Sequence, residues 1–342
     1  MNNKYPKVSI IIPVYGVEPY IADCLESVIS QSYKGDLECI IVNDCTPDKS
    51  MEIISARLKE YNGNIDFKIV NLKQNGGLSH ARNVGMAEST GDYIYFLDSD
   101  DEVSKDCISV LVEPLHSQEY DMVIGNYITT GTSIKMPPLL LEDGAYYDEK
   151  ILQSKMNGYW YQMAVNKLYR RKFLADNRLM FCEGLLHEDE LWSTEVAFLL
   201  KSMYSVSHSN TYIYKVREGS ITTQNAALKT KRVHNAYSKI LKTFYEFILE
   251  HNLGFTFFAN SILQQFAHMV VSTAEDEAER KNSYYECRNY MPAGLTLLCI
   301  NNLNIRKQIR DFHLLFSKSL GYILYKNINL KFLSIKAASV QQ

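Results

Sequence analysis

The first 127 residues alternate short apolar runs with segments whose apolar residues recur at helical spacing. Val8–Val14 and Leu37–Asn43 predict buried strands, because each is a continuous apolar run rich in β-branched residues. Ile21, Leu25 and Val28 follow a 3.6-residue period and predict a helix between them. Further helices are predicted over 47–61, 78–88 and 104–116, and further strands over 65–70, 92–97 and 120–127. Repeated strand–helix–strand units predict a mostly parallel sheet with helices on both faces.

The pattern weakens after residue 127. Glycine and proline recur between residues 128 and 156, at Gly131, Pro137, Pro138 and Gly144, which indicates loops. Strand and helix signals return over 159–214, and beyond residue 224 the sequence predicts helices rich in Tyr, Phe, Leu and Lys. We therefore predict a first domain over 1–224, with halves at 1–127 and 128–224, followed by a helical C-terminal region over 225–342.

Charge separates the same two regions. The chain has a formal net charge of −3. Residues 1–224 hold 21 basic and 31 acidic side chains, a balance of −10, whereas residues 225–342 hold 15 and 8, a balance of +7. An acidic first domain and a basic C-terminal region indicate that the two regions have different functions.

Cysteine usage and hydropathy predict the compartment. The seven cysteines are odd in number, scattered and never in a Cys-x-x-Cys pair, which favours free thiols in a reducing compartment. The run Val8–Val14 is too short for a signal peptide and contains Pro13, and no apolar stretch has the length of a membrane span. We expect a cytoplasmic protein.

Three carboxylates follow the predicted strand at 93–97. Side chains alternate along an extended segment, so Asp98 and Asp100 can point to the same side. Hard oxygen ligands with no neighbouring His or Cys suit Mg²⁺ or Mn²⁺ rather than zinc. The alternative is a polar turn in which Asp101 or Ser104 caps the next helix.

The chain has neither a Gly-x-Gly-x-x-Gly nor a Walker-type Gly-Lys-Ser/Thr loop, which removes the main support for dinucleotide or NTPase binding. Ordered blocks instead resemble the family 2 glycosyltransferases, which have the GT-A fold. These blocks are VSIIIPVY at 8–15, IIVNDCTPD at 40–48, NGGLSHARNVG at 75–85, DSDD at 98–101, NKLYR at 166–170, LHEDE at 186–190 and YIYKVREGSI at 212–221. The chain departs from the family pattern at Cys45, where glycine is usual, at Thr46, where serine is usual, and at Lys215, where arginine is frequent.

The resemblance implies a nucleotide-sugar site in the first half. Asp100 would bind the divalent cation directly, and Asp98 would contact the ribose or reach the cation through water. Asp44 would accept a hydrogen bond from the imide N–H of the base, which favours uracil or thymine over guanine; the alternative is a turn formed with Asn43. Arg82 would pair with a phosphate or with Asp98, unless it is an ordinary surface arginine on its helix. The remaining donor-side residues are Pro13, Val14 and Tyr15 at the base and ribose wall, Glu18 at the ribose, Asn75, Gly76 and Ser99, and Arg217 and Ser220 on a loop that closes over the diphosphate.

The second half would supply the acceptor side. Inverting transfer needs a carboxylate beside the acceptor hydroxyl, and Asp189 matches the family's base position, with Glu188 positioning a neighbour or the acceptor. The alternative is that this acidic run merely opens a helix, where carboxylates are favoured by the helix dipole. The other acceptor-side candidates are Lys167, His187 and the aromatic pair Trp160 and Tyr161, which would stack on a sugar unless they are simply buried.

We therefore expect a metal-dependent inverting glycosyltransferase that uses Mn²⁺ or Mg²⁺. It would move a single sugar, because the Gln-x-x-Arg-Trp signature of processive synthases is absent. The donor would be a UDP-sugar, and the acceptor a glycan or polyprenyl-diphosphate-linked hydroxyl in bacterial capsule, O-antigen or exopolysaccharide assembly. The basic C-terminal region would contact the inner membrane peripherally, through apolar and lysine residues between Phe312 and Leu333. The alternative is that this segment forms amphipathic helices that pack on the catalytic domain. The alternatives are a nucleotidyltransferase and a non-catalytic nucleotide-sugar-binding protein. No nucleic-acid partner is expected, and the oligomeric state stays open.

Overall fold

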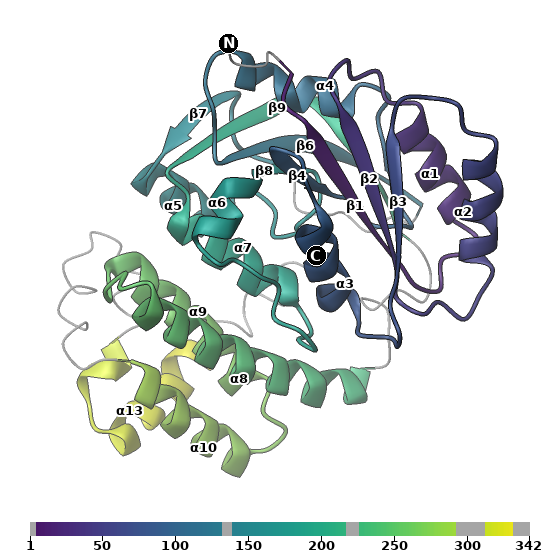
Figure 1. Cartoon of the computed structure of the whole chain (residues 1–342). Coiled ribbons are helices and arrows are strands. Elements are labelled where there is room, and N and C mark those ends of the chain that lie inside the picture. Colours follow the sequence, from purple (N-terminus) through teal and green to yellow (C-terminus); the bar gives the residue numbers. More distant parts are fainter. Residues whose placement is uncertain (1–4, 132–138, 217–225, 292–311, 331–342) are drawn as a thin grey trace. The chain divides into compact units, whose positions relative to one another are not determined.

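The computed structural model describes residues 5–131, 139–216, 226–291 and 312–330 (Figure 1). The chain divides into two compact units, Met1–Thr223 and Gln224–Gln342. The first unit is built on one sheet of nine strands, and the described part of the second is helical.

The first strands of the sheet form a parallel layer. β1 (Val8–Val14) pairs in parallel with β2 (Leu37–Asn43) and with β4 (Tyr93–Phe96), and β2 pairs in parallel with β3 (Asp66–Asn71). The resulting order β3-β2-β1-β4 brings the carboxyl ends of all these strands to one edge of the sheet. Ligands bind at that edge in open parallel sheets, so the polar segments after β2 and β4 are placed where a site is expected.

The rest of the sheet is mixed. β8 (Lys167–Arg170) is antiparallel both to β4 and to β6 (Met122–Thr130). β9 (Ser202–Lys215) runs parallel to β6, and the short strands β5 (Glu102–Val103) and β7 (Gly144–Tyr147) pair with it in antiparallel fashion. The antiparallel β8 places the second half of the unit directly beside the strand that carries the acidic turn.

Helices cover the sheet on both faces. The helices α1 (Ile21–Ile29) and α2 (Ser50–Lys59) follow successive strands in one direction, whereas α3 (Leu78–Glu88) returns across β1. Right-handed crossovers therefore place α1 and α2 on one face and α3 on the other, as Figure 1 shows. The remaining helices of this unit are α4 (Cys107–Val112), the 3₁₀ helix η1 (Glu113–His116), α5 (Glu149–Met156), α6 (Arg171–Asp176) and α7 (Glu188–Leu199).

Two predicted helices differ from the observed ones for local reasons. The helix predicted over 47–61 begins only at Ser50, because the carboxylate of Asp48 binds the backbone N–H and hydroxyl of Ser50 and holds the preceding residues in a turn. The helix predicted over 104–116 ends at Val112 and continues as η1, where Pro114 lacks the N–H that an α-helical turn requires.

α3 lies very close to the sheet. A Cβ added at Gly85 would meet Cγ2 of Ile11 at 2.3 Å, so only glycine fits where the helix crosses β1. The same helix begins after Gly77, whose φ of +83° is a conformation that other residues rarely adopt. Gly85 therefore allows α3, the helix that carries Arg82, to lie close to the sheet. Gly77 sets the residue at which this helix begins.

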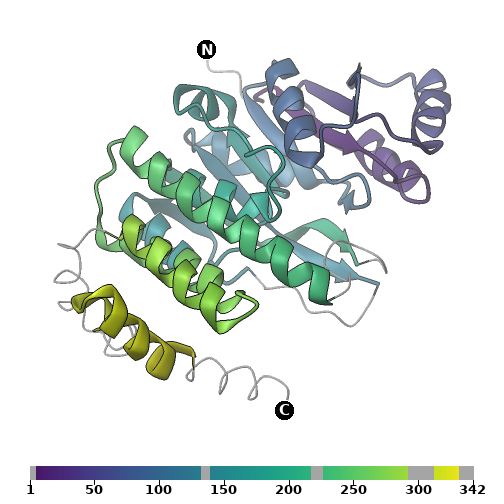
Figure 2. The same cartoon turned by 90° about the horizontal axis from the view of Figure 1, so that it is seen from below.

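The second unit consists of helices packed side by side. α9 (Phe257–Ser272) packs against α8 (Ala226–Glu250) and α10 (Glu277–Cys287), as both views show (Figures 1 and 2). Shorter helical turns follow: η3 (Arg288–Tyr290), η5 (Phe312–Leu315), α13 (Lys318–Tyr325) and η6 (Lys326–Leu330). Within the described ranges, no helix combines the length and apolar character needed to cross a bilayer.

Candidate functional site

The site centres on a buried arginine of α3. The side chain of Arg82 is fully enclosed, so the expectation of an ordinary surface arginine is wrong. Its Nη2 donates to Oδ1 of Asp98 at 2.9 Å, which is the pairing that the sequence predicted. Its Nη1 donates to Oδ1 of Asp189 at 2.9 Å and to Oε1 of Glu188 at 3.2 Å. One guanidinium thus joins the acidic turn after β4 to the first residues of α7, about one hundred positions further along the chain.

Two further features surround this guanidinium. The ring of Phe181 lies 5.1 Å from the Arg82 Cζ, within the range of a cation–π contact. The buried Nε of Arg82 has no hydrogen-bond partner in the part of the chain that the structure describes. The ion pairs of Arg82 therefore come from its terminal nitrogens alone.

Three carboxylates around one cation leave an excess of negative charge when all are ionised. Burial, and then the neighbouring charge of Asp189, raises the pKa of Glu188 to about 7. Burial also raises the pKa of Asp189, against the opposing effect of Arg82. Glu188 is thus suited to take up or release a proton near neutral pH, and Asp189 holds its proton to a higher pH than an ordinary aspartate.

The backbone at the start of α7 sets the direction of these carboxylates. His187, the residue before the helix, has φ +63°, which is a left-handed conformation. Glu188 and Asp189 occupy the first helical turn, where the dipole favours acidic residues, as the alternative interpretation proposed. The same two side chains also bind Arg82, so this acidic run does more than begin a helix.

The acidic turn itself is held from β9. Asp101 is buried, and its Oδ2 accepts a hydrogen bond from Oη of Tyr212 at 2.7 Å while its Oδ1 accepts one from the backbone N–H of Lys215 at 2.8 Å. The backbone N–H of Asp98 donates to the same Tyr212 hydroxyl at 3.4 Å. Burial, together with the charges of Asp98 and Asp100, raises the pKa of Asp101 to about 8. Asp101 therefore fastens the turn to the sheet.

The expectation that Asp101 or Ser104 caps the next helix is wrong. α4 begins at Cys107, and Asp106 is its N-cap residue. The Asp101 carboxylate is used instead by β9, and Ser104 Oγ donates to Asp106. Of the turn residues, Ser99 is buried, whereas Asp98 and Asp100 are half-buried.

The donor-side loop is fastened by Asp44. This carboxylate is 3% exposed, and its Oδ1 and Oδ2 accept hydrogen bonds from the backbone N–H groups of Gly76 (2.6 Å) and Gly77 (2.8 Å). Nδ2 of Asn75 donates to the Asp44 carbonyl at 3.3 Å. The residues after β2 and those before α3 therefore form one connected edge.

Other predicted donor-side residues lie along the same edge of the sheet. Pro13 and Val14 are buried at the end of β1, and Tyr15 directly after them is exposed. The exposed Glu18 accepts a hydrogen bond from the backbone N–H of Lys49. Lys215, where the family pattern has arginine, pairs with Glu102 and with Asp23. Arg217 and Ser220 lie outside the described residues.

Three of the acceptor-side candidates are not placed at a surface. Trp160 is buried and its Nε1 donates to Ser154, while the buried Tyr161 donates to the carbonyl oxygens of Gly125 and Asn166. Lys167 is fully buried, 4.0 Å above the Tyr161 ring, and its Nζ donates to the Met163 carbonyl. In this structure none of them offers a free face to an acceptor, because their polar atoms and rings are used inside the protein.

Sequence reasoning missed two contributors. Tyr212 belongs to a quoted block, but nothing in its spacing showed that its hydroxyl would reach the acidic turn. Lys155 of α5 gave no signal at all, yet its Nζ donates to Ser193 on α7 and lies 4.7 Å from the Trp160 ring. Burial lowers the pKa of Lys155 to about 7.

The described residues contain no group of three or more His, Cys, Asp or Glu side chains with the geometry of a metal site. The carboxylates of the acidic turn are hard oxygen donors, the type that Mg²⁺ and Mn²⁺ prefer.

Comparison with known proteins identifies the architecture. A family model described as Glycosyl transferase family 2 matches residues 9–178. Glycosyltransferase GlyA of Streptococcus pneumoniae is 32% identical over 227 residues, covering 63% of this chain but only 31% of GlyA. The putative glycosyltransferase EpsH of Bacillus subtilis is 30% identical over 257 residues, covering 72% of this chain and 70% of EpsH. The chain thus spans about a third of GlyA and most of EpsH.

A solved structure has the same architecture. The crystal structure of Staphylococcus aureus TarS residues 1–349 in complex with UDP-GlcNAc matches with a TM-score of 0.73 at 20% identity, covering 96% of this chain and 92% of that one. The predicted GT-A fold, a mixed sheet flanked by helices with a helical C-terminal region, is confirmed. The nucleotidyltransferase alternative is set aside by these matches.

Replacing Arg82 tests whether it holds the site together. Arg82→Met leaves three carboxylates without their cation, and we expect the free energy of unfolding to fall by about 3–5 kcal/mol. The folded-state pKa of Glu188, about 7, lies above its ordinary 4.5, so this carboxyl costs stability as pH rises between those values. The penalty of the substitution should therefore shrink when urea unfolding is repeated at lower pH.

The matched control is Arg57→Met, which removes an exposed arginine paired with Glu26. Its cost should stay below about 1 kcal/mol and should not depend on pH. A penalty for Arg82→Met as small as this control, or one independent of pH, would show that the carboxylates do not rely on Arg82.

Proposed function

Because this chain belongs to the family 2 glycosyltransferases, we propose that it transfers a single sugar from a UDP-sugar to an acceptor hydroxyl, with inversion and with the help of a divalent cation. The observation that carries the proposal is the sharing of Arg82 between Asp98 and Asp189. The carboxylate expected on the donor side and the one expected to act as base are thereby held within one cluster. Transfer requires the carboxylate that helps to hold the donor and the carboxylate that acts as base to lie in the same site.

The donor half of the proposal concerns the edge formed by β1, β2 and α3. Pro13, Val14 and the exposed Tyr15 would form the wall for base and ribose. Each carboxylate oxygen carries two lone pairs, so Asp44 keeps acceptor capacity for the imide N–H of uracil beyond its two backbone bonds. The TarS structure with UDP-GlcNAc supports a UDP-sugar as donor.

The acidic turn fits a divalent cation by its chemistry. Asp98 and Asp100 supply hard carboxylate oxygens, and Arg82 cannot neutralise all the carboxylates that it contacts. A bound Mn²⁺ or Mg²⁺ would stabilise the charge of the departing diphosphate. Asp100 would hold it directly and Asp98 would support it, because Asp98 is already bound to Arg82.

Asp189 would act as the general base. Its carboxylate is held by Arg82 and by the backbone amide of Ala164, and burial raises its pKa toward the range where a base works at neutral pH. Glu188 would position Asp189 or the acceptor, and the neighbouring charge couples the two carboxyls.

We further propose that the acceptor is a glycan or a polyprenyl-diphosphate-linked sugar in the assembly of a bacterial surface polysaccharide. The similarity to TarS, a poly(ribitol-phosphate) beta-N-acetylglucosaminyltransferase, supports a surface polymer as acceptor. Peripheral contact of the C-terminal region with the membrane would bring the enzyme to a lipid carrier. His187, directly before the two carboxylates, would lie on the acceptor side.

The cation can be tested through nucleotide binding. We expect Mn²⁺ to raise the affinity for UDP, measured by calorimetry, and Asp100→Asn to reduce the affinity in Mn²⁺ by about tenfold or more. Asp106→Asn is the control, because Asp106 is an exposed carboxylate at the start of α4. If neither Mn²⁺ nor the Asp100→Asn substitution changes the affinity for UDP, the metal-dependent mechanism is wrong.

The base can be tested by substitution and pH. Asp189→Asn should lower transfer by about 10²–10⁴-fold while UDP still binds. In the unmodified enzyme at saturating Mn²⁺, activity should fall towards acidic pH, because burial raises the pKa of Asp189 and the base becomes protonated at a higher pH than an ordinary aspartate. Glu188→Gln removes a negative charge beside Asp189, so the pH at which activity falls should become lower. Full turnover by Asp189→Asn would refute the assignment.

The hydrogen bonds between β9 and the acidic turn lead to another prediction. Tyr212→Phe removes the hydroxyl that binds Asp101, and we expect a loss of about 1–3 kcal/mol of stability, since a buried carboxylate loses its partner. The Mn²⁺ concentration for half-maximal UDP binding should also rise. Tyr204→Phe on the same strand is the control, because the Tyr204 ring packs on Tyr120; equal effects of the two changes would contradict a specific role for Tyr212.

A further inference from the structure

Exposed apolar side chains gather in one short segment of the second unit. Phe312, Leu315, Leu320 and Ile323 are 44%, 45%, 45% and 55% exposed. Among the described residues of this unit, Leu249 is the only other large apolar side chain with comparable exposure. Single exposed apolar residues are ordinary, but four within twelve positions call for an explanation.

The spacing of these residues places them in two rows. Phe312 and Leu315 are three apart on the 3₁₀ helix η5, where such positions align. Leu320 and Ile323 are three apart on α13, where they are neighbours on one face. The buried residues of α13 include Tyr322 and Tyr325, so the helix has an inner aromatic side and an outer aliphatic side.

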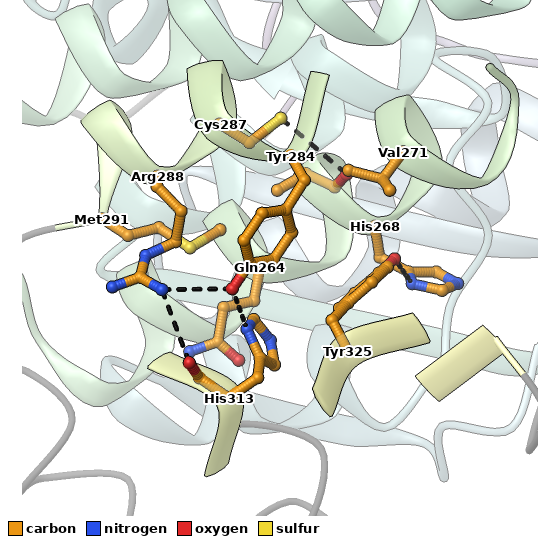
Figure 3. A pocket seen from close by; sticks show the side chains of 10 residues that line it. Gln264, His268, Val271, Tyr284, Cys287, Arg288, Met291, His313 and Tyr325 are labelled. Carbon is orange, nitrogen blue, oxygen red and sulfur yellow. Dashed lines mark hydrogen bonds between the residues drawn. The ribbon is translucent and has the colours of Figure 1, made fainter. Parts of the chain in front are cut away.

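Polar contacts hold η5 in this orientation. Nη2 of Arg288 donates to the carbonyl oxygens of Leu314 (3.1 Å) and Phe316 (3.2 Å), and its Nη1 donates to Oη of Tyr284 (3.1 Å). The same Tyr284 hydroxyl shares a 2.8 Å hydrogen bond with Nδ1 of the buried His313 (Figure 3). η5 is therefore attached through its backbone and His313, and its apolar side chains are left outside.

α13 is attached in a similar way. Oη of Tyr325 bonds to His268 of α9, as Figure 3 shows, and Oη of Tyr322 donates to Glu277 of α10 at 3.0 Å. The cavity beneath these side chains measures about 30 Å³. It has room for a water molecule or two.

The charge of this segment favours one kind of partner. From Phe312 to the end of the chain the sequence contains four lysines and no acidic residue. Lys318 is exposed beside the apolar rows, with its Nζ donating to Asn289. Two copies of such a face would repel each other, whereas an anionic surface would attract it.

We propose that the outer face of η5 and α13, formed by Phe312, Leu315, Leu320, Ile323 and Lys318, binds the anionic surface of a membrane. The apolar side chains enter the boundary between headgroups and acyl chains, and the lysine stays among the anionic headgroups. The attachment is peripheral and reversible, because the segment is short. This inference rests on the proposed function and deepens it, because it names the residues and the lipid charge for the peripheral membrane contact proposed there.

The experiment is co-sedimentation of the full chain with vesicles of phosphatidylglycerol and phosphatidylcholine, compared with vesicles of phosphatidylcholine alone. We expect binding to the anionic vesicles that weakens as salt is added. Combined replacement of Phe312, Leu315, Leu320 and Ile323 by serine should reduce the partition coefficient by about tenfold or more, since all four apolar contacts are lost. Lys318→Glu should weaken binding to the anionic vesicles.

Leu249→Ser is the matched control, because it removes an equally exposed apolar side chain elsewhere in the unit and should leave binding unchanged. UDP affinity without vesicles should be the same for all variants, which shows that they fold and separates this proposal from the proposed function. Equal sedimentation of the fourfold variant and the unmodified chain would overturn the proposal. So would a change of mass in solution caused by the fourfold variant, since the face would then bind a second copy.

Discussion

The arrangement of the first unit depends on the burial of one guanidinium among three carboxylates. Arg82 can reach Asp98 and Asp189 together only because α3 lies close to the sheet, at the height that Gly85 permits. Taking an arginine out of water is costly unless its donors find acceptors, so the acidic turn and the start of α7 stabilise the buried position of Arg82 on α3. The carboxylates proposed for chemistry are at the same time structural partners of the core.

Much of the fold could be predicted from the sequence because the signals were local. The continuous apolar runs of β1 and β2 gave strand bounds that agree with the structure, and the helix predicted over 78–88 is observed there as α3. The mixed half was harder to predict. Whether β8 inserts antiparallel between β4 and β6 depends on pairing between strands some forty or more residues apart, and no short-range pattern encodes that choice.

The residues of the candidate site show the same difference between local and long-range signals. Residues in ordered blocks, such as Asp98, Asp44 and Asp189, were predicted from their motifs, and the structure gathers Asp98 and Asp189 around Arg82. Trp160, Tyr161 and Lys167 were misjudged, because a sequence shows that a residue can stack or bind but not whether its surface is already used. Tyr212 and Lys155 act through contacts across the fold, where their neighbours in sequence carry no information.

The double hydrogen bond of Asp44 has a consequence for the evolution of donor choice. A residue that only touched the base could be exchanged freely to change nucleotide preference. Asp44 also accepts hydrogen bonds from the backbone of Gly76 and Gly77, so any exchange alters the entry to α3. If Asp44 contacts the base as proposed, a change of donor preference at this position would require compensating changes in the neighbouring loop.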